Sequence, residues 1–259
     1  MEEGGFQMYC SRKKKKLPMM APSKAHCRTV LRGDLVSVEL IDENLKKADE
    51  AIVRSGLSAK TQYFLEKLLD GRRIRTMRGV GIGNFGQRPS SSGSLQMALF
   101  LAIRSHFQPD LSTCQDPVMN SAEVEYLQRI GVETPAADDL LKPEEDLLGD
   151  DVVLFFMPHC GHALYNNLLW SNWDVDALRN LVIIGNDFSK LVVLEKHEEE
   201  IEALLKYRNL ADVVAFPPSV DDAFSDTALM TFSTEELPTI GRAKPKYNHF
   251  ACELLPNKK

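Results

Sequence analysis

The feature of this sequence that most constrains its fold is a pair of unbroken apolar runs set between amphipathic segments. Residues 152–157 and 181–184 are apolar throughout, with no alternation of apolar and polar side chains. A strand of this kind is buried on both faces, as in a parallel sheet with helices on each side. The two runs therefore predict the interior of such a sheet.

Further strand and helix patterns alternate around these runs. Strands are predicted at 77–82, 112–115, 152–157, 181–184 and 213–216, and helices at 94–107, 122–130, 164–170 and within 188–207. Two helices come first, one at 42–56 and one that follows Ser58 as N-cap and ends at Gly71. Strand–helix–strand spacing favours βαβ units. We predict an α/β fold: a Rossmann-like, doubly wound, mostly parallel sheet with helices on both faces, preceded by two helices and a disordered N-terminal tail.

Charge and cysteine usage limit the partners and the compartment. The 259 residues carry a formal net charge of −6, which provides no basic field for duplex nucleic acid. No apolar run is long enough to span a bilayer, and no secretory signal is visible. Five cysteines without a CxxC pair are typical of a reducing compartment and indicate neither disulfides nor a zinc site. We expect a cytoplasmic protein, with the nucleus as a second location and no membrane partner.

The first 29 residues differ from the rest of the chain. They carry a basic run from Arg12 to Lys16 and no apolar periodicity. Residues 1–29 are predicted to be a disordered basic tail, the one part suited to nucleic acid or to a nuclear address, with a merely solvated tail as the alternative. Residues 30–259 are predicted to form a single α/β domain.

A glycine-rich turn follows the first predicted strand. Gly81, Gly83 and Gly86 have GxGxxG spacing, which lets the backbone approach a phosphate group. The next helix does not begin at the third glycine, and the candidate ribose-binding acid, Asp116, comes later than the usual ~20 residues. Methyltransferase-type glycine spacing is also present, but Met77 stands where those enzymes carry an acid. A glycine-rich surface turn explains the pattern equally well.

Polar residues also follow the other predicted strands. A late polar segment at 223–227 either closes a crevice or turns the chain. Because ligands of open α/β sheets bind outside the carboxyl ends of the strands, these residues are expected to share one crevice. The predicted ligand-binding residues are Gly81, Gly83, Asn84, Gly86, Asp116, Asn186, Asp187 and Asp226. The pattern indicates a nucleotide-type ligand of unknown identity and no metal.

The densest cluster of reactive side chains follows the strand at 152–157. Cys160 lies at a strand-to-helix junction, where a helix dipole favours the thiolate, and His159 beside it is a candidate base. Adjacent residues point apart on extended backbone, so a hydrogen-bonded histidine next to an inert cysteine is the alternative. His159 and Cys160 are therefore the candidate catalytic residues.

Several of these segments resemble one protein family. They are 81–84, 116–117, 157–161 (Met-Pro-His-Cys-Gly), 165–173 (Tyr-Asn-Asn-Leu-Leu-Trp-Ser-Asn-Trp), 184–186 and 224–227. Together they resemble the "sensitivity to red light reduced", or SRR-like, family over about residues 70–232. The resemblance implies a role in circadian-clock input and clock-gene expression, in regulation of haem biosynthesis, and protein partners in such a pathway. It implies no defined reaction, so no catalytic residue is carried over.

Two classes of function follow from these observations. The first is a regulatory protein that senses a nucleotide-like small molecule, which we favour because the sequence has neither a complete glycine fingerprint nor a triad. The second is a transferase-like enzyme that uses a nucleotide-type cofactor in the crevice. A fold analogy alone does not decide between them.

Overall fold

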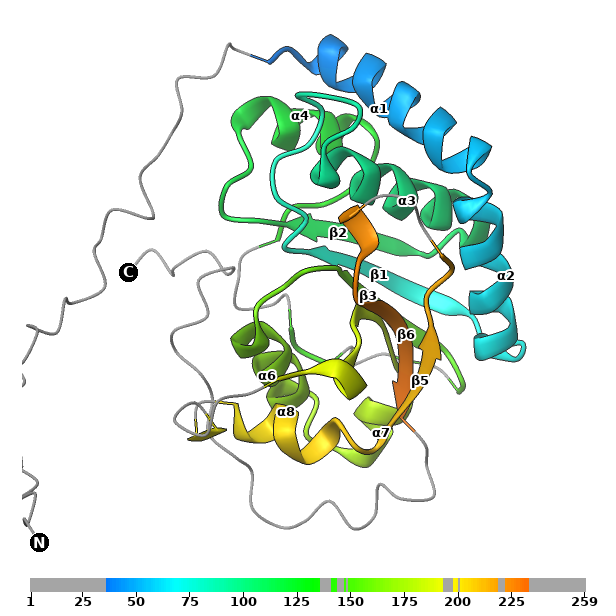
Figure 1. The fold of residues 1–259 in the computed structure, drawn as a ribbon, viewed down its shortest axis with the longest axis vertical. Helices are drawn as coiled ribbons and strands as arrows, with labels where there is room; N and C mark the ends of the chain where they lie inside the picture. The colour runs from blue at the N-terminus through cyan, green and yellow to red at the C-terminus, as the bar shows by residue number, and fades with distance from the viewer. Residues whose placement is uncertain are drawn as a thin grey trace, which may run out of the picture. The chain divides into compact units, whose positions relative to one another are not determined.

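The computed structural model describes residues 36–135, 141–143, 147, 149–192, 198–199, 201–218 and 222–232. These residues form an α/β domain in which a six-stranded mixed sheet lies between two layers of helices (Figure 1). The predicted α/β class and the helices on both faces of the sheet are confirmed. The predicted tail at 1–29, with the run from Arg12 to Lys16, lies outside the described residues.

The strand order brings distant parts of the chain together. The strands are β1 (Ile74–Val80), β2 (Leu111–Gln115), β3 (Val152–Met157), β4 (Leu181–Asn186), β5 (Ala211–Ala215) and β6 (Thr227–Phe232). Their order is β2-β1-β3-β4-β6-β5, and β1 to β4 pair in parallel. Because β1 lies between β2 and β3, the chain winds to both sides of β1, which makes a topological switch point there. β1, which leads into the glycine-rich turn, thus lies directly beside β3.

The last strand is the main departure from the expected sheet. β6 runs antiparallel between β4 and β5, so the sheet is mixed and its order is not that of the predicted Rossmann arrangement. The prediction treated 223–227 as a loop and had no strand after it. The segment contains alanine, leucine and methionine, which are common in helices, and its strand conformation depends on pairing with both neighbours.

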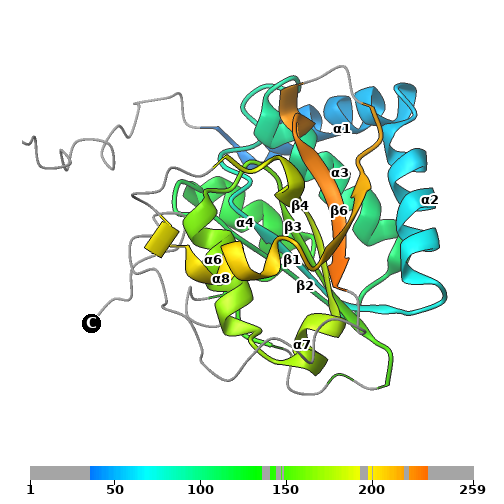
Figure 2. The ribbon, with the colours of Figure 1, turned by 60° about the horizontal axis from the view of Figure 1, so that its bottom comes forward.

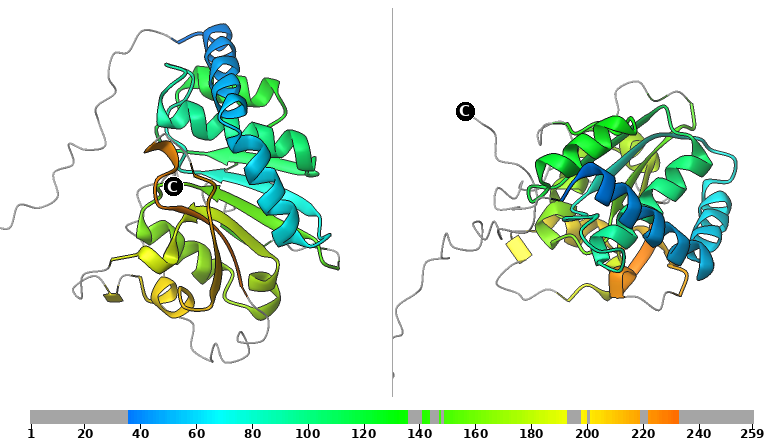
Figure 3. Two further views of the ribbon diagram at one scale, coloured as in Figure 1. Left: turned by 45° about the vertical axis from the view of Figure 1, so that its right-hand side comes forward. Right: turned by 90° about the horizontal axis from the view of Figure 1, so that it is seen from above.

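The helices form one layer on each face of the sheet (Figures 2 and 3). One layer holds α1 (Val38–Arg54), α2 (Leu57–Leu69), α3 (Ser92–Phe107) and α4 (Ser121–Arg129). The other holds α6 (His162–Ser171), α7 (Val175–Arg179) and α8 (Glu202–Tyr207). Of the short 3-10 segments, η1 (Phe188–Lys190) follows β4 and η3 (Asp222–Phe224) precedes β6. Within the described ranges, no helix is both long and apolar enough to cross a membrane.

The two leading helices are confirmed, with one correction at their junction. The predicted N-cap of the second helix, Ser58, lies inside the first turn of α2, and its hydroxyl accepts from Gln62 at 3.1 Å. The N-cap is Gly56, whose φ of +73° lets the chain start α2 almost directly after α1. Gly71, at φ +86°, follows the end of α2 as predicted.

The strand register places four loops at one end of the sheet, where the carboxyl ends of the parallel strands meet; we call this end the carboxyl edge. Val80 pairs with Gln115, Gly79 with Phe156, and Met157 with Gly185. The loops that follow β1, β2, β3 and β4 therefore leave the same edge, where ligands of α/β sheets bind.

Candidate functional site

The glycine-rich turn is held by the carboxylate of Asp116. The N–H of Gly81 donates to the carbonyl of Gln115 at 3.1 Å, which ties the turn to the end of β2. The N–H of Gly83 then donates to Oδ2 of Asp116 at 2.8 Å, and the N–H of Val118 donates to Oδ1 at 2.9 Å. Asp116 is only 8% exposed. The predicted acid thus contacts the turn itself, at a donor that a bound phosphate would use.

A second carboxylate, Glu123, was not predicted as a site residue. One oxygen accepts from the N–H of Phe85 at 2.5 Å, and the other accepts from Nδ2 of Asn84 at 2.9 Å and from the N–H of Asn120 at 2.8 Å. Burial raises the pKa of Glu123, although these hydrogen bonds oppose that shift. The four-residue capping box that starts at Asn120 is the sequence signal that could have identified it.

The three glycines of the GxGxxG pattern meet different surroundings. All have a positive φ: +69° at Gly81, +78° at Gly83 and +80° at Gly86. A Cβ atom at Gly86 would lie 2.8 Å from Ile41 of α1, whereas one at Gly83 would meet no atom within 4 Å. Gly86 therefore packs against α1, and only Gly83 faces open space.

Asn186 links the loops after β3 and β4. Its Oδ1 accepts from the N–H of His159 at 2.8 Å, and its Nδ2 donates to the carbonyl of Cys160 at 2.9 Å. The N–H of Asn186 donates to the hydroxyl of Tyr165 at 2.8 Å, and that hydroxyl donates to the carbonyl of Met157. The predicted site residue Asn186 is thus the bridge that fixes the His159–Cys160 loop.

The ring of His159 contacts the loop before β6. Its Nε2 lies 3.0 Å from the carbonyl oxygen of Ser225 and 3.3 Å from the hydroxyl of the same residue. A carbonyl oxygen only accepts, so this contact assigns the proton to Nε2. A protonated Nε2 has no lone pair with which to act as a base toward the Ser225 hydroxyl. His159 is exposed and has a φ of +60°, rare for a residue with a side chain.

The thiol of Cys160 is buried and hydrogen-bonded. Cys160 is 4% exposed, and its Sγ lies 3.3 Å from the carbonyl oxygen of Val80, to which it donates. Donation requires the protonated thiol, so this arrangement favours the unreactive form. A catalytic role for His159 or Cys160 stays a prediction.

The remaining predicted residues lie next to His159. The N–H of Asp187 donates to the carbonyl of Asp226 at 2.7 Å, and Nζ of Lys190 lies 3.2 Å from Asp187 Oδ2 and 3.9 Å from Asp226 Oδ1. Burial opposes ionisation of Asp187, but hydrogen bonds from Ser189 and Lys190 outweigh it and lower its pKa. Asp226 has a φ of +51° and a 79% exposed side chain.

The predicted residues thus form two adjoining groups. The first is Gly81, Gly83, Asn84 and Asp116, and the second is His159, Cys160, Asn186, Asp187 and Asp226. The groups touch where Gly81 meets Cys160, whose sulfur would be 2.5 Å from a Cβ atom on Gly81. Gly86 belongs to neither group. Ligand binding by these residues stays a prediction.

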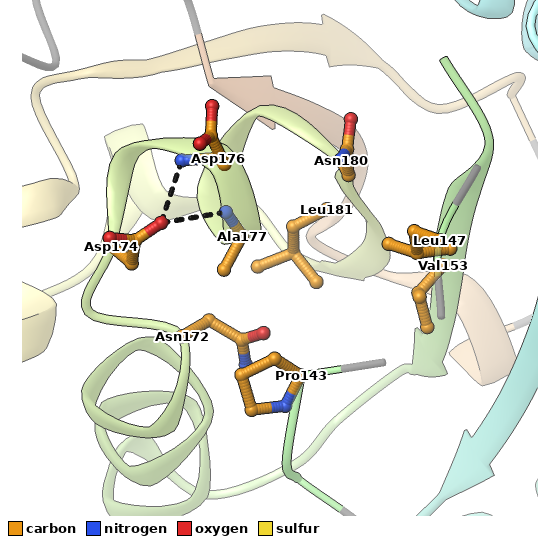
Figure 4. A pocket seen from close by; sticks show the side chains of 9 residues that line it. All are labelled: Pro143, Leu147, Val153, Asn172, Asp174, Asp176, Ala177, Asn180 and Leu181. Carbon is orange, nitrogen blue, oxygen red and sulfur yellow. Dashed lines mark hydrogen bonds between the residues drawn. The ribbon is translucent and has the colours of Figure 1, made fainter. Parts of the chain in front are cut away.

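Two cavities lie elsewhere in the domain. One of about 270 Å³ lies at the amino ends of β3 and β4, and Figure 4 shows Asn172, Ala177 and Leu181 around it. The other, of about 660 Å³, is an open groove between α1, α2 and α3. No predicted site residue lines either cavity. In the described part of the chain, no cluster of three or more His, Cys, Asp or Glu side chains is placed to hold a metal ion.

Two asparagines in the 165–173 segment have structural roles. Oδ1 of Asn166 accepts from the N–H groups of Ala203 and Leu204 at 2.9 and 3.3 Å, which caps the start of α8. Asn172 follows the end of α6, and its Nδ2 donates to the carbonyl of Leu168 in that helix and to the carbonyl of Leu141 outside it. These residues cap helix ends away from the strand-end cluster.

The chain is an α/β domain in which β1 lies between β2 and β3. At the carboxyl ends of these strands, the glycine-rich turn donates hydrogen bonds to the carboxylates of Asp116 and Glu123. A model of the SRR1 domain matches residues 54–231. The chain therefore belongs to the SRR1 family, as the resemblance of 157–161 and 165–173 implies. The match begins at the last residue of α1 and includes α2.

Three relatives show how far the similarity extends. SRR1-like proteins from Mus musculus and Drosophila melanogaster are 40% and 26% identical over 113 and 210 residues. The Arabidopsis thaliana Protein SENSITIVITY TO RED LIGHT REDUCED 1 is 29% identical over 173 residues. These matches cover 43%, 78% and 61% of this chain and 43%, 72% and 60% of the respective relatives. The chain thus spans less than half of the mouse relative's length. No solved structure matches this chain.

Proposed function

We propose that this chain is a regulatory SRR1-family protein that binds a small, nucleotide-like ligand at the carboxyl edge of its sheet, beside His159 and Asp226. The supporting observation is that these two residues, from loops far apart in the sequence, both hold a left-handed backbone at the same edge. Such conformations are costly for residues with side chains and cluster at ligand sites.

The donors and acceptors of this edge suit ligand recognition. Nδ1 of His159 bonds to no residue in the described ranges, and with the proton on Nε2 it is an acceptor for a ligand donor. Asp226 and Lys190 add an exposed carboxylate and an exposed ammonium group. The edge therefore offers an acceptor, an anion and a cation within a small area.

The hydrogen bond of the Cys160 thiol disfavours nucleophilic catalysis at this site. The proton on Nε2 of His159 and the thiol proton of Cys160 both point to carbonyl oxygens, at Ser225 and Val80. A thiolate nucleophile requires the thiol proton of Cys160 to be absent, and a general base at His159 would have to act through Nδ1.

The pathway is a further part of the proposal. The Arabidopsis relative is named for reduced sensitivity to red light, so we propose a signalling role with protein partners. Circadian-clock input and regulation of haem biosynthesis are the two pathways that the family resemblance implies. Cytoplasmic and nuclear locations belong to the same proposal, as does the Rossmann-like, doubly wound character of the parallel strands β1 to β4.

The alternative is a transferase-like enzyme with a nucleotide-type cofactor. The observation in its favour is the position of the glycine-rich turn after β1, next to Asp116 at the end of β2. In nucleotide-binding α/β folds this pairing of turn and acid holds the cofactor.

Native mass spectrometry of the full chain from its own cells tests the proposal by showing which small molecule co-purifies. Binding of that molecule is then measured by calorimetry on wild type, His159→Ala and the control His106→Ala, whose imidazole pairs with Glu66 on the helical layer. We expect His159→Ala to weaken binding about 3- to 10-fold through the lost hydrogen bond, with no change in the control. Turnover of a methyl or hydride donor that disappears in His159→Ala would instead establish the enzyme.

A further inference from the structure

An anion-binding turn offers backbone N–H groups to a phosphate group. In this chain the N–H of Gly83 is already bonded to Oδ2 of Asp116, at 2.8 Å. The other carboxylate oxygen accepts from the N–H of Val118, at 2.9 Å. The carboxylate of Asp116 therefore occupies a place where a ligand phosphate would bond.

The rest of the turn has the properties of an anion site. Gly81 and Gly83 hold left-handed backbones, and a Cβ atom on Gly83 would meet no atom within 4 Å, so the turn is not packed against other residues in that direction. The N–H groups of Ile82 and Asn84 donate to no acceptor among the described residues. With Asp116 displaced, none of the three consecutive N–H groups from residue 82 to residue 84 would have an acceptor among the described residues.

The charge of the turn opposes a phosphate while Asp116 is in place. Glu123 lies under the same turn and is completely buried, and its hydrogen-bond donors, at Phe85, Asn84 and Asn120, are all neutral. A phosphate at Gly83 would lie close to the carboxylate of Asp116, and the two like charges would repel each other.

We propose that Asp116 is an internal substitute for a ligand phosphate, an autoinhibitory contact that keeps the turn closed to phosphate and pyrophosphate groups until Asp116 moves away. This inference deepens the proposed function, since the turn borders the proposed ligand site. An acid after β2 usually bonds a ribose and increases the affinity for the ligand, whereas Asp116 decreases the affinity under our proposal. Removing the charge of Asp116 strengthens pyrophosphate binding under our proposal and weakens nucleotide binding under the ribose role.

The test compares pyrophosphate binding by calorimetry in full-length wild type, Asp116→Asn and Asp110→Asn. Asparagine keeps the shape of the side chain and one acceptor for the two N–H groups. Asp110 lies just before β2, at the opposite end of that strand, and pairs with Arg73, so its substitution makes the same charge change away from the turn. Near-ultraviolet circular dichroism checks folding, and Asp116→Ser replaces Asp116→Asn if the latter is not native.

We expect pyrophosphate to bind Asp116→Asn at least about tenfold more tightly than wild type, with Asp110→Asn unchanged. Equal or weaker binding by a folded Asp116 variant overturns the proposal, and so does no binding by any protein. These results do not depend on His159. Failure of the His159→Ala experiment with a normal pyrophosphate result would reject the proposed ligand site and leave the Asp116 contact standing.

Discussion

The sulfur of Cys160 lies where a side chain on Gly81 would have to go, since a Cβ atom there would be 2.5 Å away. Gly81 follows β1 and Cys160 follows β3, so this contact joins the loops of two neighbouring parallel strands. It connects the glycine-rich turn with the His159 loop, and the glycine at this position is required for packing as well as for its φ.

Gly81→Ala is expected to destabilise the protein more than Gly83→Ala. Both glycines have a positive φ, which costs alanine roughly 1–2 kcal/mol, but only Gly81 has a neighbour in the way. We expect a loss of about 3 kcal/mol for Gly81→Ala and about 1 kcal/mol for Gly83→Ala in urea denaturation. Adding Cys160→Ala should recover part of the larger loss in a double-mutant cycle. Equal losses at both glycines would show that the contact is absent.

Asn44 supports the turn from outside the segment that matches the family. In α1, its buried Nδ2 donates to the carbonyls of Gly86 and Gln87 at 2.8 and 3.3 Å. Asn44→Ala should cost about 1–2 kcal/mol and speed amide exchange in the turn. Asn44→Asp should cost more, because a carboxylate would face two carbonyl oxygens. Lys47→Ala, on the exposed face of α1, is the control. An aspartate variant as stable as the alanine variant would contradict this contact.

Gln115, at the end of β2, is a buried amide without a partner. It is 1% exposed, and neither its nitrogen nor its oxygen has a hydrogen-bond partner in the described structure. Gln115→Met keeps a similar length and removes the unpaired groups, so we expect about 1 kcal/mol of added stability and a Tm about 2–4 °C higher. The exposed Gln128→Met should change neither quantity. A lower Tm for Gln115→Met would mean that the amide is satisfied.

Glu123 should make the stability of the domain depend on pH. Its folded pKa is raised, mainly by burial, so the folded state holds its proton to a higher pH than the unfolded chain does. Its contribution is therefore full below the unfolded value near 4.5 and decreases as pH rises through the folded pKa.

Urea denaturation of wild type, Glu123→Gln and the exposed control Glu125→Gln from pH 4.5 upward measures this effect. The free energy of unfolding of wild type minus that of Glu123→Gln should decrease as pH rises. The corresponding difference between wild type and Glu125→Gln should stay constant. An advantage that grows with pH would show that the hydrogen bonds from Phe85, Asn84 and Asn120 outweigh burial.

Local pattern was sufficient for most of the elements. β3 spans residues 152–157 as predicted, because an unbroken apolar run is stable only where both of its faces are buried, as in the interior of the sheet. The loops after the parallel strands share an edge because such strands run in one direction, which the alternation of strands and helices already implied. The helix predicted at 42–56 corresponds to α1, which buries Leu45, Ala48 and Ile52 at helical spacing.

Only the tertiary structure decided which partner each site residue has. Nothing in the sequence near Gly83 shows that Asp116 accepts its N–H, or that Cys160 lies against Gly81. β6 is a strand because β4 and β5 leave one open position between them, and its own residues carry no strong strand pattern. Periodicity and turn chemistry depend on neighbours in the chain, whereas these contacts depend on how strands pair and loops meet, over separations that no local pattern encodes.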